Sequence, residues 1–157
     1  MAKVPKSLVI EIPGTAALHV RHVVLDFNGT LARDGVLLPR VRSRLQRLSR
    51  KLDVDVLTAD TFGTARSALR GLHLRVETIR TGADKRRFVA ERDGVVAIGN
   101  GRNDVAMMRA AELGIAVLGS EGASAELLRS VDVVTRDIAD ALDLLLDTKR
   151  LTATLRR

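Results

Sequence analysis

Four polar side chains suited to catalysis occupy comparable positions along the chain. Asp26, Thr58 and Asn100 each follow a short apolar run, and Lys85 lies on a helical segment that precedes another such run. If these runs are parallel strands, their carboxyl ends meet at one edge of a sheet and the polar residues converge there. A carboxylate can act as a nucleophile or hold Mg²⁺, while a hydroxyl and an ammonium bind anionic oxygens. This combination is typical of phosphoryl transfer.

The elements that position these residues follow from the hydrophobic pattern. Val23-Val24-Leu25 leads into Asp26, and this continuous run predicts a strand buried on both faces. Further strands are predicted at residues 54–57, 72–79, 95–98, 115–118 and 131–135. Helices are predicted at residues 41–52, 61–69, 83–92, from the 99–104 segment to 113, at 124–128 and at 137–155. The alternation predicts an α/β fold, a doubly wound parallel sheet with right-handed crossovers.

Local signals refine this outline. Residues 7–12 and 17–21 flank Pro13-Gly14, which predicts an N-terminal β-hairpin extension within residues 1–20. Asp34-Gly35 is a second hairpin turn signal. We expect Pro39 in the first turn of the first helix and Asp137 as the N-cap of the last. The length favours one domain, residues 1–157, with its core at 21–145 and the basic end of the last helix at 146–157.

Composition narrows the functional classes. The 157 residues include no Cys, which excludes disulfides, thiolate catalysis and Cys-ligated metals and suits a cytoplasmic protein. No apolar run approaches the roughly 20 residues of a membrane span, and residues 1–6 lack the apolar segment of a signal peptide. The net charge of +7 suggests a polyanion, but the chain has no Trp or Tyr on which bases could stack. Nucleic acid is therefore not the expected ligand.

The polar positions also belong to four ordered motifs. Asp26-Phe27-Asn28-Gly29-Thr30 matches Asp-x-x-Gly-Thr, and Thr58-Ala59-Asp60 is similar to Thr-Gly-Asp. Lys85 follows alone, and Gly99-Asn100-Gly101-Arg102-Asn103-Asp104 is similar to Gly-Asp-Gly-x-Asn-Asp. On these motifs, residues 20–145 resemble the haloacid dehalogenase-like (HAD) superfamily, and within it the soluble relatives of the phosphorylation domain of P-type ATPases.

The resemblance implies a role for each matched residue. Asp26 would be the nucleophile that forms an aspartyl-phosphate, with Thr58 and Lys85 as the other catalytic residues. The phosphoryl group would be bound by Phe27, Asn28, Thr58, Ala59 and Lys85. The implied cofactor is Mg²⁺, with Asp26, the Asn28 carbonyl, Asn100 and Asp104 as its ligands.

Two positions depart from the family pattern. Phosphatases of the family have a second Asp where this chain has Asn28, and that Asp protonates the leaving group and activates water. Such acid–base help is typically worth about 10²–10⁴-fold in rate. Asn100 likewise stands where the family usually has a Mg²⁺-binding Asp, and its neutral amide is a weaker ligand. The resemblance therefore implies a Mg²⁺-dependent phosphohydrolase or phosphotransferase that is slow. A non-catalytic or regulatory module that binds Mg²⁺ and an anion or a protein partner is the alternative.

The short gaps between motifs predict an open site. Residues 31–57 and 59–84 each have room for one helix and one strand, so no cap domain is expected. The resemblance then implies a phosphorylated or other anionic substrate, including macromolecular ones, or a homo-oligomer in which a neighbouring subunit shields the site. Five arginines either line the mouth or are ordinary surface residues: Arg33, Arg80, Arg86, Arg87 and Arg102. The arginine-rich helix within 40–51 is interpreted as a solvated amphipathic face, with an anion or partner surface as the alternative.

Other readings of the pattern fit less well. A response-regulator receiver also places Asp, Thr and Lys on a doubly wound sheet, but it needs an acidic pair at its first strand that is missing here. A dinucleotide-binding domain needs Gly-x-Gly-x-x-Gly after its first strand, and this chain has none. Asp60 is open to two interpretations, a helix N-cap or a site residue.

Overall fold

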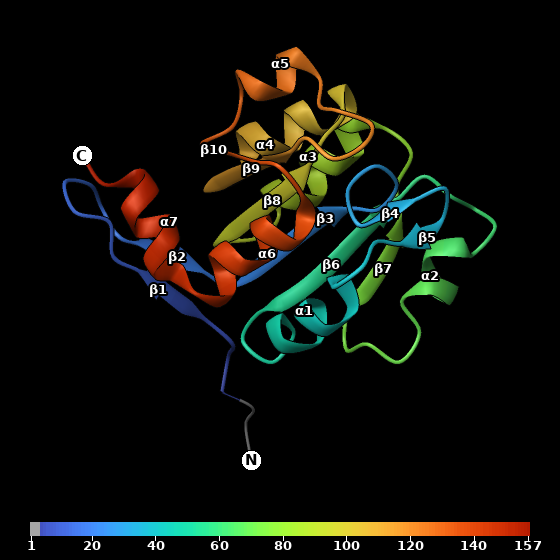
Figure 1. Ribbon diagram of the computed structural model, residues 1–157, viewed down its shortest axis with the longest axis horizontal. Helices are drawn as coiled ribbons and strands as arrows, with labels where there is room; N and C mark the ends of the chain where they lie inside the picture. The colour runs from blue at the N-terminus through green and yellow to red at the C-terminus, as the bar shows by residue number, and fades with distance from the viewer. Residues whose placement is uncertain (1–3) are drawn as a thin grey trace.

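A computed structural model describes residues 4–157 and confirms the doubly wound α/β architecture. Six parallel strands form the central sheet in the order β10-β9-β8-β3-β6-β7 (Figure 1). Their bounds are β3 His22–Asp26, β6 Asp53–Thr58, β7 Arg75–Thr78, β8 Val95–Gly99, β9 Leu113–Val117 and β10 Val133–Thr135. The chain adds β6 and β7 on one side of β3 and then returns to add β8, β9 and β10 on the other. Between β3 and β8 the order reverses, and sheets of this kind bind ligands at that point.

Helices cover both faces of the sheet. On one face α1 (Val41–Leu48) packs against α6 (Ile138–Leu146), and on the other α3 (Gly82–Ala90) packs against α4 (Val105–Ala110). α2 (Thr64–Ala68) connects β6 to β7, and α5 (Ala125–Leu128) connects β9 to β10 (Figure 1). The result is a three-layer sandwich.

Strand alternation explains why there are two hydrophobic cores. Successive side chains of a strand point to opposite faces of its sheet. Val23 and Leu25 therefore join the cluster that contains Leu45 of α1, while Val24 joins the cluster that contains Met107 of α4. All of these side chains are fully buried. A continuous apolar run is what a strand with helices on both faces requires, as the sequence predicted.

The hairpin after β3 confirms the turn signal at Asp34-Gly35. β4 (Ala32–Arg33) and β5 (Val36–Leu37) pair antiparallel across this two-residue loop. Both turn residues have left-handed backbone, with φ of 51° at Asp34 and 80° at Gly35, as a type I′ turn requires. Only this hairpin and α1 separate β3 from β6, and only α2 separates β6 from β7. The expected absence of a cap domain from these two gaps is confirmed.

The two ends of the described chain pack together. β1 (Leu8–Ile10) pairs antiparallel with β2 (Leu18–Val20), and α7 (Thr148–Leu155) lies beside this hairpin (Figure 1). The Thr152 hydroxyl donates to the Glu11 carbonyl at 3.0 Å, and the Arg157 N–H donates to the Pro13 carbonyl at 3.1 Å. Residues 1–3, part of the predicted extension and of the segment compared with signal peptides, lie outside the described residues. Within residues 4–157, no helix has both the length and the apolar character needed to cross a membrane.

Several predicted boundaries differ from the structure. The helix predicted at 41–52 ends at Leu48, the helix predicted at 61–69 begins at Thr64, and the strand predicted at 72–79 begins at Arg75. Three further differences have a visible cause. The last helix is two helices, because Asp147 adopts extended backbone (φ −128°, ψ 93°) and its carboxylate accepts the Lys149 N–H at 3.3 Å as the cap of α7. The helix expected to reach residue 113 ends at Ala110, because Leu113 pairs with β8 as the first residue of β9. Pro39 lies in a turn before α1, which begins at Val41 after a left-handed Arg40 with φ 67°.

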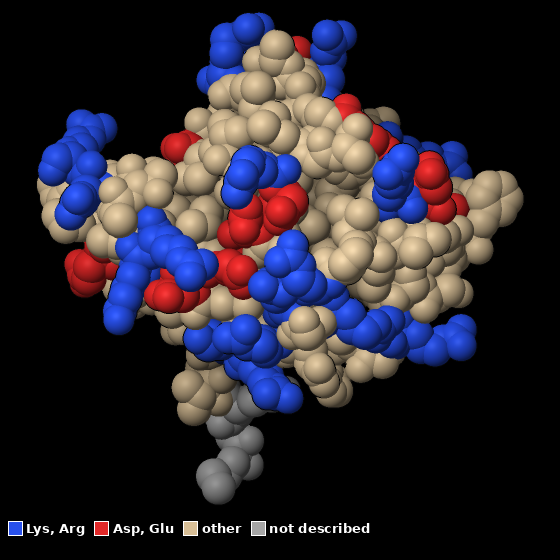
Figure 2. All heavy atoms as spheres, viewed as in Figure 1, with Lys and Arg blue, Asp and Glu red and all other residues tan. Residues whose placement is uncertain are grey.

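Basic side chains gather over α1, interspersed with acidic ones (Figure 2). Arg44 forms two hydrogen bonds with Asp143 of α6, at 2.8 and 3.1 Å. Arg42 donates to the Arg70 carbonyl at 2.9 Å. These two arginines connect α1 to α6 and to the segment that follows α2. Their partners lie within the same molecule, which agrees with the interpretation of α1 as an amphipathic helix with one solvated face.

Candidate active site

Asp26 lies at the end of the central strand, where the backbone turns sharply. The Phe27 carbonyl accepts the N–H groups of Leu31 at 2.9 Å and Ala32 at 3.0 Å. Gly29 makes this turn possible because its φ of 81° is left-handed, a region that side chains disfavour. The tight loop keeps the Asp26 side chain at the sheet edge with 14% of its surface exposed.

Lys85 is buried between two carboxylates. Its Nζ lies 2.8 Å from Asp26 Oδ1 and 2.7 Å from Asp104 Oδ1, and only 2% of its side chain is exposed. The first turn of α3 holds it there, and that turn is capped by the Thr81 hydroxyl, which accepts the Asp84 N–H at 3.1 Å. An ammonium enclosed in this way holds two negative groups close together.

Asp104 organises the loop that follows β8. Its Oδ2 accepts the backbone N–H of Asn100 at 3.1 Å and that of Gly101 at 3.0 Å, and its side chain is fully buried. Because Asp104 Oδ1 also binds Lys85, one carboxylate joins the β8 loop to α3. The last motif is therefore fixed relative to Asp26 through Lys85.

The charges of this cluster shift the pKa values of its members. Burial is the main cause that raises the pKa of Asp26 from 3.8 to about 6, followed by repulsion from Asp104, while Lys85 acts in the opposite sense. For Lys85, burial alone would lower the pKa, but attraction to Asp26 and Asp104 outweighs it and raises the pKa. The excess of carboxylate charge over ammonium charge leaves the cluster net negative above about pH 6.

Thr58 and Asp60 end β6 at the same sheet edge. The Thr58 hydroxyl accepts the Asp60 N–H at 3.1 Å and is buried. The Asp60 carboxylate accepts the Phe62 and Thr64 N–H groups, each at 2.8 Å, and so orders the loop that leads into α2, whose N-cap is Gly63. These N–H groups, that of Phe62 most strongly, lower the pKa of Asp60. The N-cap interpretation of Asp60 is therefore wrong, because Gly63 occupies that position, and Asp60 lines the cleft described next.

A cleft of about 450 Å³ joins these segments. Its lining residues are Asp26, Asn28, Thr58, Ala59, Asp60, Lys85, Asn100, Gly101, Asn103 and Glu121. Of the predicted site residues, Phe27 and Asp104 are absent from the lining because both are fully buried behind it. Phe27 still contributes its backbone N–H, which faces the Asp26 carboxylate. Among the residues that the structure describes, none of the five arginines considered for the mouth lines the cleft.

The two amides that replace acids have different partners. Asn28 Oδ1 accepts the Gly35 N–H at 3.3 Å, so this side chain contacts the β4–β5 hairpin. Asn100 Nδ2 donates to the Gly122 carbonyl at 3.2 Å, and its Oδ1 accepts the Thr30 hydroxyl at 3.4 Å. The Asn28 side chain thus stabilises the β4–β5 turn, while the Thr30 hydroxyl lies between the Asn100 oxygen and Asp26.

Sequence reasoning missed four residues of this region. Thr30 was matched to a motif without a role, yet its hydroxyl lies 3.5 Å from Asp26 Oδ2 and 3.4 Å from Asn100 Oδ1. Gly101, Asn103 and Glu121 line the cleft and were not predicted as site residues. Glu121 follows β9, whose carboxyl end lies at the same edge as those of β3 and β8, so the rule that located Asp26 could have located it as well.

Comparison with known proteins agrees with this geometry. Residues 85–141 match the family model of the haloacid dehalogenase-like hydrolases. An uncharacterized protein of Methanocaldococcus jannaschii is 53% identical over 62 residues, which cover 40% of this chain and 67% of that protein.

Solved structures share the fold at low sequence identity. The 3-deoxy-D-manno-octulosonate 8-phosphate phosphatase of Moraxella catarrhalis, solved with magnesium and phosphate ions, has a TM-score of 0.69 and 13% identity over 85% of this chain and 90% of its own. A zinc-transporting P-type ATPase has a TM-score of 0.60 and 23% identity, over 74% of this chain and 20% of its own. The fold, the ordered motifs and the family match agree, and the chain belongs to the haloacid dehalogenase-like superfamily of hydrolases.

Proposed function

We propose that the chain is a Mg²⁺-dependent phosphohydrolase that acts through an aspartyl-phosphate on Asp26. One observation supports this most directly. Lys85 Nζ lies 2.8 Å from Asp26 Oδ1, while among the described residues the side-chain contact of Asp26 Oδ2 is the longer one to Thr30, at 3.5 Å. The carboxylate is thus oriented through one oxygen and has the other available to attack phosphorus.

The cleft has oxygen donors that suit a hard cation. Among the described residues, Asn100 Oδ1 has the Thr30 hydroxyl as its hydrogen-bond partner at 3.4 Å, and the Asp26 carboxylate also contacts that hydroxyl, at 3.5 Å. Mg²⁺ prefers oxygen ligands and usually retains several waters. In residues 4–157, no three Asp, Glu, His or Cys side chains are grouped closely enough to hold a metal together. Amide and carbonyl oxygens would therefore complete the set Asp26, Asn28, Asn100 and Asp104, and Mg²⁺ bound there would offset charge on the phosphoryl oxygens.

The reaction would take two displacements at phosphorus. In the first, an Asp26 oxygen forms a bond to phosphorus, and the bond to the leaving oxygen breaks with its electron pair. Lys85, Thr58 and the N–H groups that follow Asp26 bind the phosphoryl oxygens, and the leaving group takes its proton from water. In the second, water attacks phosphorus, the bond to Asp26 breaks, inorganic phosphate departs, and the water proton passes to solvent. The substrate class is a phosphorylated compound.

Asn28 makes the second displacement the slow one. Its amide cannot take a proton from water, and Asn28 Oδ1 already accepts the Gly35 N–H at 3.3 Å. The same observation favours the second candidate function, a regulatory module that binds Mg²⁺ and an anion without turnover. The open cleft leaves either form accessible to a large ligand or to a neighbouring subunit.

Phosphate release and fluoroberyllate binding test the proposal together. We expect slow, Mg²⁺-dependent phosphate release from a panel of phosphate monoesters, and Mg²⁺-dependent fluoroberyllate binding, both lost in Asp26→Asn. Asp93→Asn makes the same change on an exposed turn and is the matched control. Fluoroberyllate binding without release would favour the regulatory module. Release that survives in Asp26→Asn would exclude Asp26 as the nucleophile.

A further inference from the structure

Glu121 extends from the loop between β9 and α5 to the edge of the nucleophile loop. It lines the cleft that contains Asp26, and also an adjoining cavity of about 370 Å³ beside the β4–β5 hairpin. The same loop approaches the Asp26 loop at Gly119, where an added Cβ would lie 3.7 Å from the Gly29 carbonyl oxygen (Figure 1). Glu121 thus brings an additional carboxylate to the site from a segment outside the four motifs.

Gly29 leaves room for this carboxylate. A Cβ on Gly29 would overlap with Glu121 Oε2 and would lie 2.8 Å from Asn100 Nδ2 and 3.1 Å from Asn100 Oδ1. The Glu121 carboxylate and the Asn100 amide therefore meet above the same glycine. Asn100 is one of the two positions at which this chain has an amide in place of the acid that its family pattern implies.

The charges of the site suggest what Glu121 does there. Asp26 and Asp104 carry two negative charges against the one positive charge of Lys85, which is in contact with both. Glu121 adds a further negative charge beside Asn100, and negative charge attracts a divalent cation. The described residues contain no group of three acidic, His or Cys side chains suited to direct metal binding. Glu121 is thus placed to act through water rather than as a direct ligand.

We propose that Glu121 is a metal-positioning residue that binds water ligands of the cation and replaces the charge missing at Asn100. This inference rests on the proposed Mg²⁺-dependent function. Mutation of a residue that hydrogen-bonds to the ligands of a metal typically lowers metal affinity about 10–100-fold. Glu121 would be such a residue, provided by the β9–α5 loop.

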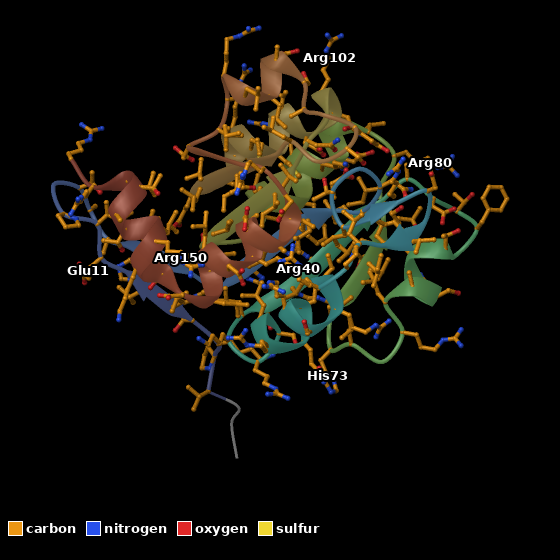
Figure 3. The ribbon with its side chains drawn as sticks, in the orientation of Figure 1. Glu11, Arg40, His73, Arg80, Arg102 and Arg150 are labelled. Atoms are coloured by element: carbon orange, nitrogen blue, oxygen red, sulfur yellow. The ribbon has the colours of Figure 1, made fainter. Side chains whose placement is uncertain are left out.

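Isothermal titration of the metal-free protein with Mg²⁺ tests this without substrate. We expect Glu121→Gln to weaken Mg²⁺ binding about 10–100-fold relative to wild type. Glu11→Gln makes the same change at the N-terminal hairpin, far from α5 in Figure 3, and should bind Mg²⁺ as wild type does. Equal affinity of wild type and Glu121→Gln would overturn the inference. Wild type that binds no Mg²⁺ would overturn it together with the cofactor of the proposed function.

Asn100→Asp provides a second and independent arm. If Glu121 replaces the charge missing at Asn100, Glu121→Gln should weaken Mg²⁺ binding less when residue 100 is already Asp. In that background we expect the change in log Kd to be less than half of the change seen in wild type. If positions 100 and 121 act independently, their effects on log Kd for Mg²⁺ should instead add. Additive effects would show that Glu121 does not replace the charge missing at Asn100. The proposed function would still stand if phosphate release is observed and is lost in Asp26→Asn. Circular dichroism of each variant verifies that the fold is retained.

Discussion

Replacing the proposed nucleophile should stabilise the metal-free protein. Asp26 is mostly buried, and burial and Asp104 together raise its pKa to about 6 even though Lys85 is in contact with it. In its ionised form the side chain therefore opposes folding. Asp26→Asn keeps the shape of the side chain and removes the charge, so we expect the variant to be the more stable protein at pH 8 in the presence of a chelator.

The size of the effect follows from the change in proton affinity. The pKa of Asp26 rises from 3.8 to about 6 on folding, a difference of about 2 units, and each unit corresponds to about 1.4 kcal/mol. Because the folded state holds this proton more tightly, unfolding releases it between about pH 4 and pH 6. The wild type therefore loses up to about 3 kcal/mol as the pH rises through that window, and Asp26→Asn does not.

Urea unfolding between pH 4 and pH 8 measures this difference. At pH 8 the variant should be more stable by up to about 3 kcal/mol, or roughly 6–12 °C in Tm for a chain of this size. At pH 4 the difference should vanish, and Asp93→Asn should follow wild type throughout. Added Mg²⁺ should narrow the gap at pH 8, because a ligand stabilises the state that binds it and the variant lacks one carboxylate. A variant that is less stable than wild type at pH 8, or a gap independent of pH, would refute the reasoning.

Three further substitutions have defined outcomes. Lys85→Met leaves Asp26 and Asp104 without their shared cation and should cost about 3–5 kcal/mol at pH 8, with a smaller cost at pH 4 in the same urea series. Asn28→Asp restores the missing acid and should raise steady-state phosphate release by about 10²–10⁴-fold over wild type, and an unchanged rate would point to another slow step. Asp137→Ala removes the hydrogen bond from the Asp140 N–H, 2.8 Å long, and should cost about 1 kcal/mol in urea unfolding. No change there would mean that packing alone holds the start of α6.

The sequence was sufficient for the sheet and for most of the lining of the cleft. Asp26, Thr58 and Asn100 could be located because each follows an apolar run, and parallel strands bring such positions to one edge. The Asp34-Gly35 turn could be predicted because few dipeptides accept two left-handed residues in succession. Asp137 caps α6 as expected, since a short acidic side chain satisfies the first free N–H groups of a helix.

What the sequence did not predict depends on contacts between distant segments. Nothing in the spacing of Lys85 indicates that its ammonium lies between two carboxylates, because that depends on how α3 packs against the β8 loop. Glu121 follows β9, so the strand-end rule indicates the region in which it lies, but a loop has no periodicity that shows which of its side chains reaches the cleft. Asp147 lies within a stretch of good helix formers, and the capping hydrogen bond that divides this stretch competes with helical propensity.

The position of β3 between β6 and β8 affects how the site responds to thermal motion. The amides of a strand paired on both sides exchange with solvent only when the sheet opens, which in small domains approaches complete unfolding. Val24 and Leu25, just ahead of the nucleophile, should therefore be among the slowest amides to exchange deuterium. The loop that carries Glu121 lies outside the strand ladder, and its amides should exchange through local opening. The Asp26 carboxylate would then stay in a fixed position, while local opening of the loop moves the Glu121 carboxylate away from the cleft and back without disturbing the sheet.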